Sequence, residues 1–217
     1  MNVKIQAVIF DLDGVLTDTI EPHYRSWQAL MDEQGVPFDR ALNEKLRGLG
    51  RPESLEIILG PRTGQFSGEE KERLLRRKNE LFLELIQSMT PADLYPGVSE
   101  LLNELKELGL PLALASSSRN AETILNRLGV RGLFRVVVDA NEVPDSKPHP
   151  GVYLAAAERL GASPERCVAV EDGASGIEAA LAAGMRVVGV GPVERVGRAH
   201  RIYPDMRTLT AEGLLGV

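Results

Sequence analysis

The chain has 217 residues, of which 43% are hydrophobic and 26% charged, with a formal net charge of −6 and a sequence pI near 5.2. The negative balance excludes an overall positive field that would attract nucleic acid. Cys167 is the single cysteine, so no disulfide can form within the chain and we expect a cytoplasmic location. The sequence has no long uncharged apolar run, and Asp11 comes too early for a signal peptide, so we expect no membrane contact.

The first predicted element is a short buried strand. Residues 5–10 form a β-branched apolar run that ends directly before turn-forming aspartates and Gly14. From there to residue 92 the pattern is helical, with no convincing strand. Within this block, Ser67 and Glu70 form a predicted capping box, because the serine can accept a hydrogen bond from the amide three residues on while the glutamate reaches back.

After a Pro/Gly-rich joint at residues 90–97, helices and strands alternate. The predicted helices span 98–108, 120–128, 150–161 and 174–183, and the predicted strands span 110–115, 135–139, 166–171 and 186–190. This alternation predicts a parallel sheet covered by helices on both faces, and the first strand must join it because one strand is not stable alone. We therefore predict an α/β fold: a Rossmann-like core domain (1–15 and 93–217) with an inserted all-helical cap domain (16–92).

Polar residues of unusual chemistry follow four of the predicted strands, at the end of the sheet where ligands bind in such folds. Asp11 and Asp13 lie two residues apart after the first strand, so both carboxylates point the same way. Two carboxylates so close to each other need a cation or a shared proton between them. A simple Asp-Gly turn is the alternative interpretation of this stretch.

The other three strand ends add complementary groups. Residues 116–120 offer hydroxyls and amides at a helix N-terminus, which suits either an anion or ordinary capping. Lys147 lies in a proline-rich loop. It either supplies a compact positive charge to a site or is an ordinary solvated surface lysine. Glu171 and Asp172 are hard oxygen ligands suited to Mg²⁺, or simply compensate a helix dipole. Together these groups are what a phosphoryl group requires.

The four motifs resemble those of the haloacid dehalogenase superfamily: Asp11-x-Asp13-Gly-x-x-x-Asp18, Ser116, Lys147-Pro148 and Glu171-Asp172. Nearly the whole chain is similar to its β-phosphoglucomutase family, through Thr19, His23, Trp27 and the segments LRGLGRPESL (46–55), RKNE (77–80), TPADLYPG (90–97) and ALASSSRN (113–120). This resemblance implies an enzyme that interconverts β-glucose 1-phosphate and β-glucose 6-phosphate. It also implies Mg²⁺ as the metal and β-glucose 1,6-bisphosphate as the priming intermediate.

The resemblance further implies roles for single residues. Asp11 would be the nucleophile that becomes an aspartyl phosphate, and Asp13 the general acid and base. Ser116 and Lys147 would hold the transferring phosphoryl group, while Thr19 and His23 would tune Asp13; for His23 the alternative is a helix-face histidine without a role. Mg²⁺ would be held by the Asp11 carboxylate, the Asp13 carbonyl, Asp172 and, directly or through water, Glu171.

A bisphosphate intermediate has a second phosphate, which needs an anion site far from the nucleophile. Arg51 can form a bidentate hydrogen bond to a phosphate, and Gly48 and Gly50 allow the backbone to come close to that phosphate. The full expected substrate-binding set is Asp13, Trp27, Gly48, Leu49, Arg51, Ser54, Lys78, Ser117, Ser118, Arg119 and Asn120. Four positions depart from the family pattern: Arg47 stands for lysine, Gly50 for serine and Ser117 for alanine, and Pro52 directly follows Arg51. Arg47 keeps the positive charge but changes its reach and hydrogen-bond geometry, so we expect the departures to affect the sugar preference rather than the chemistry.

Other functions remain open from the sequence. A phosphatase of the same superfamily, acting on a small sugar phosphate, would share every core motif. A signalling receiver domain also uses an aspartate beside Mg²⁺ and a lysine, although it would leave the helical insert unexplained. A catalytically dead binding protein is disfavoured by the intact acidic motifs. Because no exposed apolar stripe stands out, we expect a monomer.

Overall fold

The computed structural model describes residues 4–217, which contain the predicted parallel sheet. Its strands lie in the order β3-β2-β1-β4-β5-β6, and every neighbouring pair is parallel. They are β1 (Ala7–Phe10), β2 (Leu112–Ala115), β3 (Val136–Val138), β4 (Cys167–Glu171), β5 (Arg186–Val190) and β6 (Arg201–Tyr203). The first strand occupies the middle of the sheet, where Ile9 pairs with Ala113 on one side and Ala169 on the other. The predicted α/β fold is confirmed.

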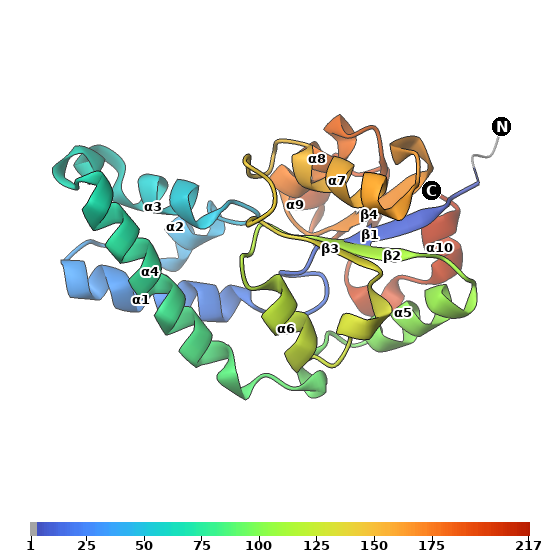
Figure 1. Cartoon of the computed structure of the whole chain (residues 1–217), viewed down its shortest axis with the longest axis horizontal. Helices are drawn as coiled ribbons and strands as arrows, with labels where there is room; N and C mark the ends of the chain where they lie inside the picture. Colours follow the sequence, from blue (N-terminus) through green and yellow to red (C-terminus); the bar gives the residue numbers. More distant parts are fainter. Residues whose placement is uncertain (1–3) are drawn as a thin grey trace.

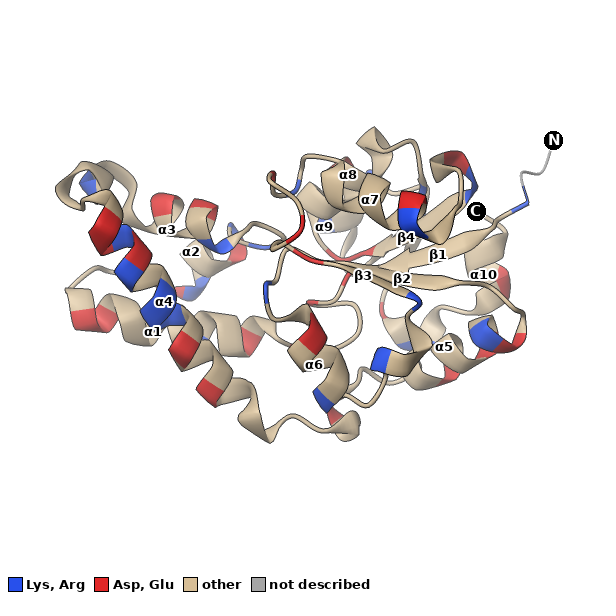
Figure 2. Ribbon diagram, in the orientation of Figure 1, with Lys and Arg blue, Asp and Glu red and all other residues tan. Residues whose placement is uncertain are grey.

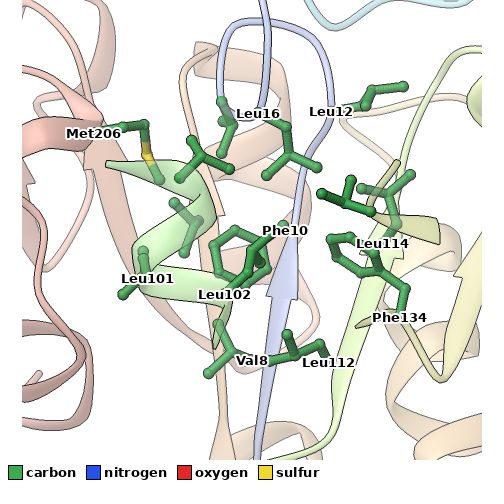
Figure 3. Packing of buried hydrophobic residues seen from close by; sticks show 14 of the residues in the cluster. Val8, Phe10, Leu12, Leu16, Leu101, Leu102, Leu112, Leu114, Phe134 and Met206 are labelled. Atoms are coloured by element: carbon green, nitrogen blue, oxygen red, sulfur yellow. The ribbon is translucent and has the colours of Figure 1, made fainter. Parts of the chain in front are cut away.

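Helices cover both faces of this sheet (Figure 1). They are α5 (Val98–Glu107), α6 (Ala121–Arg127), α7 (Gly151–Leu160), α8 (Ala174–Ala182), α9 (Val193–Val196) and α10 (Ala211–Leu215). Strand alternation divides the core: Val8 and Phe10 pack against α5, α6 and α10, whereas Ala7 and Ile9 pack against α7 and α8. Figure 3 shows Phe10 packed among Leu102, Leu114 and neighbouring side chains in the first cluster.

The predicted elements occur with slightly trimmed ends. Strand β5 has the predicted bounds, and the other predicted strands are one to two residues shorter. Strand β6 was not predicted, because three half-buried or exposed residues leave no alternating or apolar run to recognise. Helices α9 and α10 were also missed, since each spans barely one turn.

The insert after β1 consists of α1 (Ile20–Gln34), α2 (Arg40–Glu44), α3 (Arg51–Leu59) and α4 (Gly68–Leu85), joined to short 3₁₀ turns at 60–65, 86–88 and 91–93. Ser67 and Glu70 form the predicted capping box at the start of α4. This helical part has its own hydrophobic cluster around Trp27, Leu30 and Met31.

The exact division into two domains at residues 15/16 and 92/93 stays a prediction, and residues 1–3 of its first segment lie outside the described range. The hydrophobic cluster of the helical part supports the division, whereas Phe82 and Ile86 pack into a cluster of the sheet. The end of α4 is therefore anchored on the core. None of the helices in residues 4–217 combines the length and the apolar character that crossing a membrane requires.

Candidate active site

The predicted polar residues meet at the end of the sheet that faces the helical part. Figure 2 shows acidic residues gathered at this end and basic residues on the segment of the helical part that approaches it. At the centre, the Lys147 Nζ atom donates to Asp11 Oδ1 at 2.7 Å, to Glu171 Oε1 at 2.6 Å and to the Ala115 carbonyl at 3.0 Å. The three charged side chains are buried, so one cation bridges two carboxylates from different strands.

Burial shifts the ionisation of this group. It raises the pKa of Asp11 well above its ordinary value, and the Glu171 carboxylate raises it further against the opposing effect of Lys147. Burial lowers the pKa of Lys147, but the two carboxylates outweigh this effect and raise that pKa above its ordinary value. Lys147 therefore remains a fixed positive charge beside the candidate nucleophile.

Asp11, Glu171 and Asp172 bring three buried carboxylate oxygens within 4.8 Å of one another. Burial and the Glu171 charge raise the pKa of Asp172 to about 7, against the opposing effect of the Arg47 and Arg195 charges. The chain packs closely here, because a Cβ atom at Gly14 would lie 2.3 Å from Asp172 Oδ2. A compact cluster of hard oxygen donors fits a divalent cation.

Glu171 is more heavily hydrogen-bonded than the other two acids. Its Oε1 atom accepts from Lys147 and from the Tyr153 hydroxyl at 2.6 Å, while Oε2 accepts from the backbone N–H of Asp172 at 3.1 Å and more weakly from that of Gly173. The fully buried Tyr153 thus helps to fix the orientation of this carboxylate. Sequence reasoning missed Tyr153, because an aromatic residue inside an apolar helix face gives no functional signal.

Asp13 lies beside a chain of polar side chains from α1 and α4. The Thr19 hydroxyl donates to Asp13 Oδ1, and His23 Nε2 lies 3.9 Å from the same oxygen. On the far side of the ring, His23 Nδ1 is 2.7 Å from Lys78 Nζ. When Lys78 is charged it can only donate, so in that state Nδ1 accepts and the proton of the neutral imidazole sits on Nε2, facing Asp13.

The pKa shifts of Asp13 and His23 are consistent with acid and base chemistry at Asp13. Burial raises the pKa of Asp13 above its ordinary value, partly offset by the Thr19 hydrogen bond. Burial also lowers the pKa of His23, together with the nearby Lys78 and Arg51 charges, so the imidazole is neutral. A carboxyl group whose pKa is raised holds a proton more readily than an ordinary aspartate, which suits a group that donates a proton and later accepts one.

A cavity lies between the core and the helical part, with Asp11 and Asp13 in its wall. It brings together most of the predicted substrate-binding residues: Asp13, Trp27, Gly48, Leu49, Arg51, Ser54, Lys78, Ser117, Ser118 and Arg119, with Ile20, His23, Asn43, Leu46, Arg47 and Asp172 completing the wall. Ser116 and Lys147 line an adjoining cleft on the other side of Arg51. Asn120 lines neither and instead contacts Asn79.

Several hydroxyls of this set already have partners. Ser54 Oγ donates to the Gly50 carbonyl at 2.8 Å within the first turn of α3. Ser116 Oγ accepts from the Ser118 N–H at 3.0 Å. Trp27 is almost fully buried and packs in the hydrophobic cluster of the helical part, while its ring lies 5.2 Å from Lys78 Nζ.

Arg51 begins α3 and reaches toward α4. Its Nη2 atom donates to Asn79 Oδ1 at 2.7 Å, and Nη1 makes a longer contact to the Leu75 carbonyl at 3.4 Å. Burial and the neighbouring Arg119 charge lower the pKa of Arg51 to about 10. Both partners are uncharged oxygens, so the positive charge at this end of the cavity is uncompensated.

The two parts of the chain are joined by contacts from the segment 47–48. Ser175 Oγ donates to the Arg47 carbonyl at 3.1 Å, and Ser117 Oγ donates to the Gly48 carbonyl at 2.9 Å. Arg47 Nη1 donates to Asp172 Oδ2 at 3.0 Å.

Arg195 forms a second bridge between the two parts. It donates from Nε to the Asp172 carbonyl at 2.7 Å and from Nη1 to Glu44 Oε1 at 3.3 Å. Two departures from the family pattern, Arg47 and Ser117, are therefore engaged in closing the cavity.

Residues 5–184 match the family model of the haloacid dehalogenase-like hydrolases. The chain belongs to this family. The match covers the strands that carry Asp11, Ser116 and Glu171, together with the whole helical insert.

Individual members of the family resemble the chain over most of its length. β-Phosphoglucomutase of Bacillus subtilis is 43% identical over 210 residues, which cover 96% of this chain and 93% of that protein. A crystal structure of β-phosphoglucomutase from Clostridium difficile superposes with a TM-score of 0.93 at 39% identity, covering 96% of this chain and 94% of that one. A phosphorylated carbohydrates phosphatase of Thermotoga maritima is 36% identical over 190 residues, covering 86% of this chain and 85% of that protein.

The structure also shows residues at the site that the sequence motifs did not indicate. Asn79, Tyr153 and Arg195 contact the predicted site residues Arg51, Glu171 and Asp172, and Ser175 contacts Arg47, which lines the cavity. Asn79 lies within the RKNE segment, so its neighbour Lys78 was a usable signal. For the other three, the signal exists only once the chain is folded. The catalytic and binding roles of the predicted residues stay predictions.

Proposed function

We propose that this protein is a Mg²⁺-dependent β-phosphoglucomutase that interconverts β-D-glucose 1-phosphate and β-D-glucose 6-phosphate through β-glucose 1,6-bisphosphate. The observation that carries the proposal is the uncompensated Arg51 cation in the wall of the cavity that also contains Asp11. A sugar carrying two phosphates needs a nucleophile for one and a separate cation for the other. The 43% identity to a β-phosphoglucomutase over most of the chain supports the same function.

Asp11 would attack the phosphoryl group and become an aspartyl phosphate, which divides one difficult transfer into two easier ones. Lys147, fixed 2.7 Å from Asp11 Oδ1, would balance the negative charge that gathers on the phosphoryl oxygens. Ser116, at the end of β2, would donate its hydroxyl to the same group. Asp11, Glu171, Asp172 and the Asp13 carbonyl would hold Mg²⁺, which when bound supplies positive charge to the phosphoryl oxygens.

Asp13 would carry the proton between the two half-reactions. It would protonate the sugar oxygen that leaves and then accept the proton of the sugar hydroxyl that attacks. The hydrogen bond from Thr19 and the proximity of His23 Nε2 would hold the carboxyl group in position for both steps. Lys78 would act behind His23 by fixing the tautomer of the ring.

Closure of the helical part over the core would exclude water, which competes with the sugar hydroxyl for the aspartyl phosphate. The contacts of Ser117 and Ser175 with the backbone of the segment 47–48 favour the closed arrangement. A mutase needs this exclusion more than a phosphatase does, because water is the second substrate of a phosphatase. The predicted cytoplasmic location and monomeric state stay predictions.

The main alternative is a sugar-phosphate phosphatase, for which the similarity to the Thermotoga maritima protein is the specific observation. The two functions are distinguished by incubating the protein with β-glucose 1-phosphate, Mg²⁺ and a trace of the bisphosphate. A mutase forms glucose 6-phosphate well in excess of free phosphate. Dominant release of free phosphate would show that the phosphatase alternative is correct.

A further inference from the structure

Arg51 is held by neutral groups alone. Among residues 4–217, its guanidinium hydrogen-bonds to the Asn79 amide oxygen and the Leu75 carbonyl, and no carboxylate lies within ion-pair distance. The charge that acts on its pKa is the positive charge of Arg119. Most other arginines that contact the insert are paired with acids, as in the Arg40 contact with Glu21 and the Arg47 contact with Asp172. The environment of Arg51 therefore orients the cation without cancelling its charge.

Asn79 joins this cation to the core. Its Oδ1 atom accepts from Arg51 Nη2 at 2.7 Å and, at the same time, from Asn120 Nδ2 at 2.9 Å. Arg51 and Asn79 come from α3 and α4 of the insert, whereas Asn120 precedes α6 of the core. One amide oxygen thus sets the direction of two donors, one from the insert and one from the core, that are expected to meet the second phosphate.

The chemical identity of Asn79 matters as much as its position. A carboxylate here would accept the same two hydrogen bonds and would make a charge-assisted pair with Arg51. That pair would neutralise the cation and compete with a phosphate dianion for it. An amide oxygen gives the orientation and leaves the charge for the ligand.

We propose that Asn79 is a positioning residue for the second phosphate: its neutral oxygen aligns Arg51 of the insert with Asn120 of the core and keeps the arginine available to an anion. The inference rests on the proposed function for the identity of the ligand, a sugar bisphosphate. It predicts that Asn79 contributes to the affinity added by the second phosphate and leaves the chemistry at Asp11 unaffected.

The test measures that added affinity directly. Glucose 1,6-bisphosphate and glucose 6-phosphate are titrated calorimetrically into the protein with Mg²⁺, in an Asp11→Asn background that prevents turnover, and the ratio of the two affinities is compared between variants. Asn79→Asp lowers the ratio about tenfold or more, because the new carboxylate neutralises Arg51. Asn79→Ala lowers it less, about two- to fivefold, because only the alignment is lost. Asn103→Asp makes the same chemical change on the exposed face of α5 and leaves the ratio unchanged.

A second comparison shows whether Asn79 acts through Arg51. In an Arg51→Ala background, Asn79→Asp changes the ratio less than twofold, since the arginine that the new carboxylate would neutralise is absent. Equal losses with and without Arg51 would mean that Asn79 acts through the structure in general, and the proposal would be overturned. An Asn79→Asp ratio equal to that of the unsubstituted chain would overturn it as well.

The outcome is separable from the proposed function. The product assay with β-glucose 1-phosphate decides between mutase and phosphatase, whereas the affinity ratio needs no turnover. A protein that only releases phosphate but shows the Asn79 pattern refutes the mutase and keeps the positioning role. A protein that forms glucose 6-phosphate but lacks the Asn79 pattern supports the mutase and refutes the positioning role.

Discussion

Lys78 is a single side chain in which stability and function are expected to conflict. It is 1% exposed, its ammonium lies 4.7 Å from the centre of the Phe82 ring, and its polar contact is His23 Nδ1. Burial and the Arg51 charge lower the pKa of Lys78 well below its ordinary value, which means that the fold disfavours the charged form. Such a residue is kept for what it does to its neighbour rather than for the stability of the fold.

We expect Lys78→Met to stabilise the protein and to impair catalysis. Replacing a buried cation that has no carboxylate partner by an apolar side chain of similar length raises the free energy of unfolding by about 1–3 kcal/mol. Each kcal/mol corresponds to about 2–4 °C in Tm. Activity falls because His23 loses the donor that fixes its tautomer. The measurements are thermal unfolding at pH 7 and turnover of β-glucose 1-phosphate, with Lys106→Met on the exposed face of α5 as the control.

The stability gain depends on pH in a defined direction. The pKa of Lys78 is lowered in the folded state, so the unfolded chain binds the proton more tightly and the wild-type protein becomes relatively more stable as pH rises toward 10.5. The difference in unfolding free energy between Lys78→Met and wild type therefore narrows over that range. A variant that is less stable than wild type at pH 7 would show that the charged lysine stabilises the fold.

At the scale of elements, the segment between α2 and α3 determines how the insert meets the core. Gly48 has a φ of 75°, and a Cβ atom at this position would lie 2.3 Å from Ser175 Oγ. Both facts require glycine here, because the left-handed conformation and the close approach each disfavour a side chain. The loop can then place two successive carbonyls on Ser117 and Ser175.

The double variant Ser117→Ala/Ser175→Ala should therefore open the cavity. Each lost hydrogen bond costs about 1 kcal/mol, so the ratio of closed to open molecules falls about 30-fold if the two effects add. Small-angle X-ray scattering should give a larger radius of gyration than for wild type. Ser163→Ala, on an exposed core loop, is the control. An unchanged scattering curve for the double variant would mean that these serines do not hold the two parts together.

The sequence predicted the parts of the site that follow from the sheet. Asp11 and Glu171 could be placed together because the ends of the neighbouring parallel strands β1 and β4 meet at one edge, and Lys147 because its loop follows β3 at the same edge. The Ser175 contact with Arg47 spans 128 residues, and the contact of Asn120 with Asn79 spans 41. These pairs depend on how the insert docks on the core, which no local periodicity encodes. Strand β6 escaped prediction for a different reason, since it is short and lies at the edge of the sheet.

At the scale of the whole molecule, the chain carries a net charge of −6 and concentrates three buried carboxylates at the end of the sheet. Lys147 and Arg47 balance part of this charge. A cation that binds only the folded protein adds RT ln(1 + [L]/Kd) to its stability, about 2.7 kcal/mol at a hundred times Kd. The stability of the fold should consequently respond to divalent metal.

We expect saturating Mg²⁺ at pH 7.5 to raise Tm by about 5–10 °C over NaCl of equal ionic strength. Asp172→Asn should lose most of this increase, because one of the three carboxylates is gone. Asp145→Asn, an exposed acid outside the cluster, should retain it. If Mg²⁺ raised Tm equally in both variants, the cation would be bound elsewhere.

The central claim is that Arg51 holds a second phosphate while Asp11 transfers the first. It is tested most directly by ³¹P NMR of wild-type protein and Arg51→Ala, each given β-glucose 1-phosphate, Mg²⁺ and a trace of bisphosphate, by measuring the ratio of glucose 6-phosphate formed to free phosphate released. The predicted result is a high ratio for wild type and a ratio at least tenfold lower for Arg51→Ala, because the bisphosphate is no longer retained for the second transfer. Equal ratios for the two proteins, or dominant phosphate release by wild type, would contradict the claim.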